Sequence, residues 1–110
     1  MSKNKTLKFQ EFDAFPNTLD FNSDTKGKWN EIFGNDKKIV LELACGKGDY
    51  ANGMAQIFPD VNFVGVDIKG NRLWRGAKNA LEFGLNNVRF LRIQIDFIEK
   101  HFETFSDLFR

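Results

Sequence analysis

"VLELACGKGDY", residues 40–50, decides how this chain folds. An apolar, β-rich run ends in a short loop that contains Gly46 and Gly48. An acid stands on each side of this loop, with Glu42 inside the apolar run and Asp49 directly after the second glycine. This pattern predicts a buried strand that leads through a ligand-binding loop into a helix.

Strands and helices alternate outward from this loop. The expected strands are residues 38–44, 61–68 and 87–95, and the expected helices are residues 49–58, 71–83 and 96–105. Such an alternation builds right-handed βαβ units around a parallel sheet, so the fold class is α/β. In the first of these helices, the side chains expected on the apolar face are Tyr50, Met54, Ile57 and Phe58.

The N-terminal part is expected to differ from this regular pattern. Residues 1–25 are polar with scattered Phe and are interpreted as an extended arm, either docked by its aromatic rings or mobile. A short helix follows at residues 27–34, with Gly34 as its stop. We therefore divide the chain into an arm with a short helix, residues 1–34, and an α/β unit, residues 35–110.

Composition sets limits on function. The chain has 110 residues and a net charge of +1, so it forms one domain at most and carries no overall field that would attract nucleic acid. A single cysteine, Cys45, forms no intrachain disulfide and is interpreted as a small filler; it fits a cytoplasmic location. His101 is the only histidine and lacks metal-ligand partners, so no metal site is expected. No secretory signal, membrane span or nucleophile–base set stands out, and the catalytic residues stay unassigned.

Two cofactors compete for the glycine loop. Residues 46–51, GKGDYA, match the dinucleotide pattern G-x-G-x-x-G/A, and Asp67 lies at a suitable distance to hold a ribose hydroxyl. A dinucleotide, however, would place its pyrophosphate beside Asp49 and Glu42, which repel it. S-adenosylmethionine carries a sulfonium and an ammonium instead, and both favour nearby carboxylates. The charges therefore favour S-adenosylmethionine, and NAD stays as the alternative.

From about residue 29 to residue 102 the chain resembles the bacterial tRNA (guanine-N7-)-methyltransferase family, most specifically in "VDIKGNRLWRGAK" at residues 66–78. The resemblance implies a Rossmann-like fold, S-adenosylmethionine as cofactor, and methylation of N7 of a guanine in the tRNA variable loop. The residues that it aligns with cofactor contacts are Glu42, Gly46, Gly48, Asp67 and Gln94, with Asp96 as a second choice for Gln94.

Two departures from the family pattern lead to further expectations. Ala44 stands where the family has Gly, and an added methyl group disfavours positive φ. The family also continues through further strands and a Phe-Pro-Asp-Pro segment that this sequence lacks. We therefore expect the N-terminal half of the fold, with three strands in the order 3-2-1 and residues 38–44 at the edge. Such a chain is expected to bind the cofactor and to self-associate through the exposed edge.

A run of cations without an acid is the candidate contact for tRNA. Lys69, Arg72 and Arg75, followed by Lys78, fit RNA phosphates, although a solvated helix face explains them equally. Trp74, within the same run, is expected in the core. A third function class, a non-catalytic module that binds RNA or protein, stays open beside the methyltransferase and the NAD-dependent oxidoreductase.

Overall fold

The computed structural model describes residues 5–103 and 108–109. In chain order the elements are α1 (Lys5–Ala14), β1 (Thr18–Asp20), α2 (Trp29–Phe33), β2 (Ile39–Leu43), α3 (Asp49–Ile57), β3 (Asn62–Asp67), α4 (Gly70–Glu82), β4 (Val88–Arg92), the 3₁₀ helix η1 (Ile95–Lys100) and β5 (Leu108–Phe109). The alternation predicted from the sequence is confirmed for β2, α3, β3, α4 and β4.

The described strands form one parallel sheet in the order β1-β4-β3-β2-β5. The predicted order 3-2-1 corresponds to β4-β3-β2 and is confirmed. The expectation that β2 lies at the edge is wrong, because β5 pairs with it at Leu41 and Glu42. A two-residue strand carries no periodic signal, so β5 becomes visible only through this pairing.

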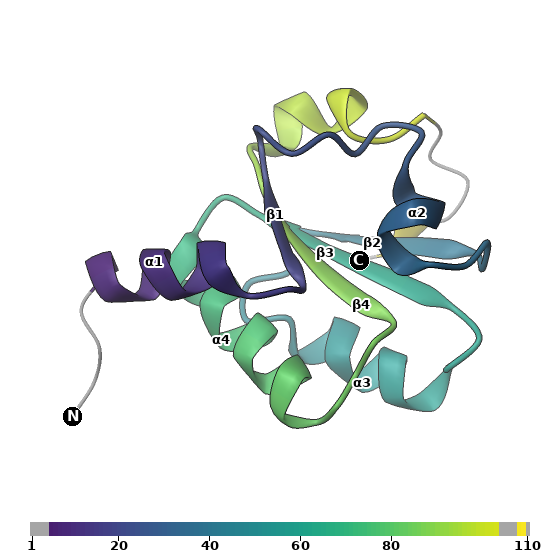
Figure 1. Ribbon diagram of the computed structural model, residues 1–110, viewed down its shortest axis with the longest axis horizontal. Helices are drawn as coiled ribbons and strands as arrows, with labels where there is room; N and C mark the ends of the chain where they lie inside the picture. The colour runs from purple at the N-terminus through teal and green to yellow at the C-terminus, as the bar shows by residue number, and fades with distance from the viewer. Residues whose placement is uncertain (1–4, 104–107, 110) are drawn as a thin grey trace.

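Helices cover both faces of the sheet (Figure 1). α1, α3 and α4 lie on one face, where Phe12, Phe63 and Phe90 belong to one buried cluster. α2 and η1 lie on the other face over a second cluster that includes Trp29 and Leu91. The sheet is therefore buried on both sides, and its free ends become the natural place for a ligand.

The interpretation of residues 1–25 as an extended arm is wrong for the residues that the structure describes. Lys5–Ala14 form α1, and Thr18–Asp20 form β1, which pairs with β4. Phe12 is buried against the α4 side of the core, and the Thr18 hydroxyl donates to the Phe15 carbonyl just beyond the helix (3.0 Å). Packing against α4 stabilises α1, although the sequence of this segment contains only a weak local signal for a helix.

The predicted apolar face of α3 is wrong for three of its four residues, since only Met54 packs against the buried cluster. Tyr50 and Phe58 are exposed and Ile57 is 66% exposed, whereas Ala51 and Ala55 are buried. α3 begins at the expected residue, Asp49, but its small side chains face the sheet, and the helix can therefore approach the sheet closely. Among the described residues, no helix combines the length and the apolar character needed to cross a membrane.

Candidate functional site

The ends of β2, β3 and β4 frame a pocket of about 380 Å³. Its lining residues are Ala44, Asp67, Ile68, Ile93, Gln94, Ile95 and Asp96. Three predicted positions, Asp67, Gln94 and its second choice Asp96, therefore meet in one place. Of the described residues that line this pocket, two are acids and none is a cation, which favours a ligand that carries positive charge and no phosphate.

Asp67 ties the loop after β2 to the loop after β3. Its Oδ2 accepts the backbone N–H of Gly46 (2.8 Å), and its Oδ1 accepts those of Ile68 (2.7 Å) and Lys69 (3.0 Å). The side chain does not take the N-cap position of α4; Lys69 holds that position, and its own side chain makes no capping hydrogen bond. A carboxylate offers about four acceptor positions, so Oδ2 keeps one for a hydroxyl of a ligand.

Glu42 lies on β2 just before the loop and is only 8% exposed. Burial raises the pKa of its carboxyl group; a backbone hydrogen bond from Ala51 lowers this pKa, and the charge of Asp49 raises it further. Its Oε1 is buried and has no hydrogen-bond partner. A buried acceptor without a partner is costly, so this carboxylate is suited to meet a cationic group that is brought by a ligand.

The loop between β2 and α3 is held in a tight, left-handed path. Gly48 has a φ of 71°, and a Cβ built on it would lie 2.5 Å from the ring of Phe90. Ala44 also has positive φ, 57°, and is the only non-glycine residue of the described chain in that region. The sequence comparison with the family pattern thus identified a strained position correctly.

Cys45 lies within this loop as a free, half-buried cysteine. Burial raises the pKa of its thiol, and the charges of Glu42 and Asp67 raise it further. Its Sγ lies 2.9 Å from the position that a Cβ on Gly65 would take, so the side chain fills the space between loop and sheet. These contacts support its interpretation as a small filler.

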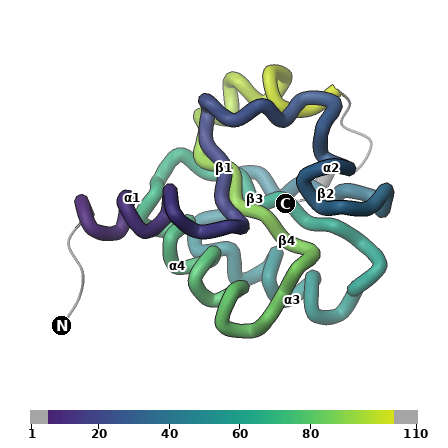
Figure 2. Tube along the Cα trace, in the orientation of Figure 1, coloured from purple at the N-terminus to yellow at the C-terminus, as the bar shows by residue number. Residues whose placement is uncertain are grey.

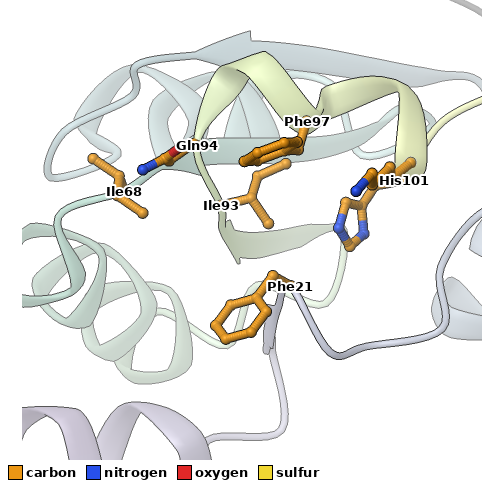
Figure 3. A pocket seen from close by; sticks show the side chains of 7 residues that line it. Phe21, Ile68, Ile93, Gln94, Phe97 and His101 are labelled. Carbon is orange, nitrogen blue, oxygen red and sulfur yellow. The ribbon is translucent and has the colours of Figure 1, made fainter.

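A second, more apolar pocket of about 360 Å³ adjoins the first. Both pockets include Ile68, Ile93 and Gln94 in their lining. Figure 3 shows Phe21 across the cavity from Phe97, with His101 at one end. Sequence reasoning missed Phe21, Phe97 and the isoleucines; the one available signal was that Ile68 directly follows the strand-end acid Asp67.

The predicted tRNA contacts lie outside both pockets. Lys69, Arg72 and Arg75 are exposed at the start of α4 and along it. Trp74 is buried, as expected for a core residue. Within the described part of the chain, no three His, Cys, Asp or Glu side chains come together as metal ligands do.

A family model described as a methyltransferase matches residues 36–108, which include β2 to β4, the first residue of β5 and the whole acidic pocket. The chain belongs to this methyltransferase family. A tRNA (guanine-N(7)-)-methyltransferase of Christiangramia forsetii is 52% identical over 112 residues, covering 94% of this chain and 50% of that protein. The chain spans about half the length of the curated relatives it matches, 44% and 50% for two of them.

Solved methyltransferases share the fold of this family member. A 30S ribosomal A1408 methyltransferase from an uncultured bacterium superposes with a TM-score of 0.60 at 17% identity, covering 69% of this chain and 37% of the other. PKMT2 from Rickettsia typhi, solved in complex with AdoHcy, superposes with a TM-score of 0.51 at 27% identity. That match covers 54% of this chain and 12% of the other. The resemblance and the fold class predicted from the sequence are confirmed.

Proposed function

We propose that this chain binds S-adenosylmethionine for methyl transfer to N7 of a guanine in tRNA. The observation that carries this proposal is the acidic lining of the pocket at the strand ends, together with the buried, unpartnered Oε1 of Glu42. The relatives named as tRNA (guanine-N(7)-)-methyltransferases support the choice of substrate, and the neighbour in complex with AdoHcy supports the choice of cofactor.

The residues of the site fit this cofactor in charge and in hydrogen-bonding capacity. Glu42 would meet the ammonium group, and Asp67 would accept a ribose hydroxyl at its remaining Oδ2 position. Gln94 would lie beside the adenine together with the exposed Ile68. The positive φ values of Gly46 and Gly48 keep the loop path that these contacts need.

The chemistry asks for positioning rather than for proton transfer. The bound cofactor supplies an electrophilic methyl group on a sulfonium. Guanine N7 holds an exposed lone pair and needs no base to attack it, so alignment of the two reactants dominates the rate. The part of this chain is to hold the donor through Glu42 and Asp67 and to exclude phosphate-bearing competitors.

The substrate would be held through its backbone. Lys69, Arg72 and Arg75 are exposed on α4, whose first residue lies three positions after Asp67. Phosphate contacts dominate RNA affinity and fix the orientation of the nucleic acid without reading its sequence. These cations would therefore orient tRNA toward the cofactor pocket.

Calorimetry of the 110-residue chain with S-adenosylhomocysteine and, separately, with NAD tests the cofactor assignment. Binding of S-adenosylhomocysteine with no binding of NAD is the expected result. Binding of NAD alone by a folded sample would overturn the proposal and favour the oxidoreductase interpretation of GKGDYA.

A further inference from the structure

α1 and α4 pack side by side on the outer face of the molecule (Figure 2). At their junction three cations converge on the indole ring of Trp74. Lys8 Nζ from α1 lies 5.0 Å from the ring centroid, and from α4 Arg75 Cζ lies at 4.8 Å and Lys78 Nζ at 5.0 Å. We call these four residues the Trp74 surface.

Contacts on both sides of Lys8 fix α1 in this place. Trp74 Nε1 donates to Glu11 Oε1 (2.9 Å), one helical turn after Lys8. The ring of Phe9 lies against Gly70, where an added Cβ would come within 2.4 Å of it. Because Gly70 begins α4 directly behind the loop of Asp67, the position of α1 is linked to the candidate cofactor pocket.

The positive charge of the Trp74 surface is balanced only in part, by the single neighbouring carboxylate of Glu11. Among the described residues none of its three cations forms an ion pair, whereas elsewhere Lys28 pairs with Asp24 at 3.8 Å. The acid closest in sequence to Lys8, Glu11, uses Oε1 for the indole N–H. Three like charges around one ring repel one another, and the ring attraction together with the one carboxylate of Glu11 compensates only in part. An anion bound between the two helices would relieve this repulsion.

We propose that the Trp74 surface binds the phosphate backbone of RNA and that α1 is part of this binding surface. The cations spread over two helices rather than lining a closed pocket, which fits a polyanion better than a single small anion. Two further exposed cations, Arg72 and Lys69, lie toward the N-terminal end of α4, the end next to the acidic pocket. This inference rests on the proposed function, because that function supplies tRNA as the polyanion.

The test compares a double variant, Lys8→Gln with Lys78→Gln, with the parent chain. Binding of a tRNA transcript is measured by fluorescence anisotropy over a series of KCl concentrations. Removal of one phosphate-binding cation should reduce the slope of log affinity against log salt by about 0.7–0.9, so the double variant should show a slope lower by roughly 1.4–1.8. A control with the same change in net charge, Lys26→Gln with Lys28→Gln, alters exposed residues in the segment before α2 and should keep the parent slope.

Calorimetry with S-adenosylhomocysteine on the same samples separates the two ideas. If the parent binds neither S-adenosylhomocysteine nor tRNA, the proposed function fails and this inference fails with it. If the parent binds both, an unchanged slope for the Lys8 and Lys78 variant overturns the inference alone. An equal reduction of the slope in the control also overturns it, since binding would then follow total charge rather than this surface.

Discussion

Replacing Glu42 by glutamine should stabilise the free protein and weaken its cofactor binding. In the free chain the carboxylate is buried, and its Oε1 has no partner. Glu42→Gln keeps the shape of the side chain and an oxygen for the backbone of Ala51, but removes the charge. A residue whose removal stabilises a fold while reducing binding is kept for its ligand.

The size of both effects follows from the burial. An unsatisfied buried acceptor costs about 1–3 kcal/mol, and the amide should recover about half of this. For a domain near 100 residues, 1 kcal/mol corresponds to roughly 4–8 °C in Tm. On the binding side, a hydrogen bond to a charged group contributes about 1.5–3 kcal/mol, so the affinity for S-adenosylhomocysteine should fall on the order of 10- to 100-fold.

The pH dependence gives an independent check. Burial raises the pKa of Glu42 above its ordinary value of 4.5. The folded chain therefore binds more protons than the unfolded chain above that pH, so this group makes the protein less stable as the pH rises through the raised pKa. The gain in stability from Glu42→Gln should be largest above that pKa and should vanish below pH 4.5.

Thermal unfolding and calorimetry on Glu42→Gln, with Glu99→Gln as the control, measure both effects. Glu99 is exposed, so the same chemical change there should alter neither stability nor binding appreciably. The reasoning is refuted if Glu42→Gln lowers the Tm at alkaline pH, or if it binds S-adenosylhomocysteine as tightly as the parent does.

Four other results should follow. Ala44→Gly should relieve the strain of the left-handed backbone at this position. After subtraction of the entropy that glycine adds to the unfolded chain, the unfolding free energy should rise by about 0.5–1 kcal/mol. An unchanged urea midpoint would contradict this. Gly76→Ala should cost about 1–3 kcal/mol and weaken cofactor binding, because the new Cβ would lie 2.6 Å from the Lys47 carbonyl oxygen; parental affinity in calorimetry would speak against it. Burial lowers the pKa of His101 below 6.5, so the unfolded chain takes up a proton there more readily than the folded chain does. The free energy of unfolding should therefore fall as the pH drops below 6.5. In urea melts at a series of pH values, His101→Gln should reduce this dependence on pH. Within the described strands, β5 pairs with only two residues of β2. The rest of the β2 edge should therefore pair with a second copy of the chain. Sedimentation that shows a monomer at all concentrations would exclude this.

The polar residues at the strand ends could be predicted from the sequence, whereas the face of α3 that packs against the sheet could not. Asp67 and Gln94 each come at or just after a β-rich run, and parallel strands bring such positions to one edge of the sheet. The expected and the observed start of α3 are both residue 49, so the error lies in the choice of the face. The large side chains of Tyr50 and Ile57 were assigned to the core, whereas the small side chains of Ala51 and Ala55 are the ones buried there.

α1 shows why contacts between residues that are far apart in the sequence cannot be predicted from local sequence patterns. Its aromatic residues recur every three positions among polar neighbours, which is a weak signal for a helix. Burial of Phe12 and the hydrogen bond between Glu11 and Trp74 join residues that are far apart in the sequence. Nothing in residues 1–25 indicates a partner 63 positions away, so the helix and the contribution of Lys8 could be found only in the folded chain.

Although the net charge is close to neutral, acidic and basic side chains gather in different parts of the fold, and both proposals depend on this separation. With 16 basic and 15 acidic residues, the chain as a whole attracts neither a cation nor a polyanion. The fold places acids at the strand ends, the site proposed for a sulfonium and an ammonium, and it gathers cations across α1 and α4. Were the two sets mixed, each would screen the other and neither ligand would be favoured. Under the two proposals, this separation on one small sheet would let a chain with a charge of +1 hold a cationic donor and a polyanionic acceptor together.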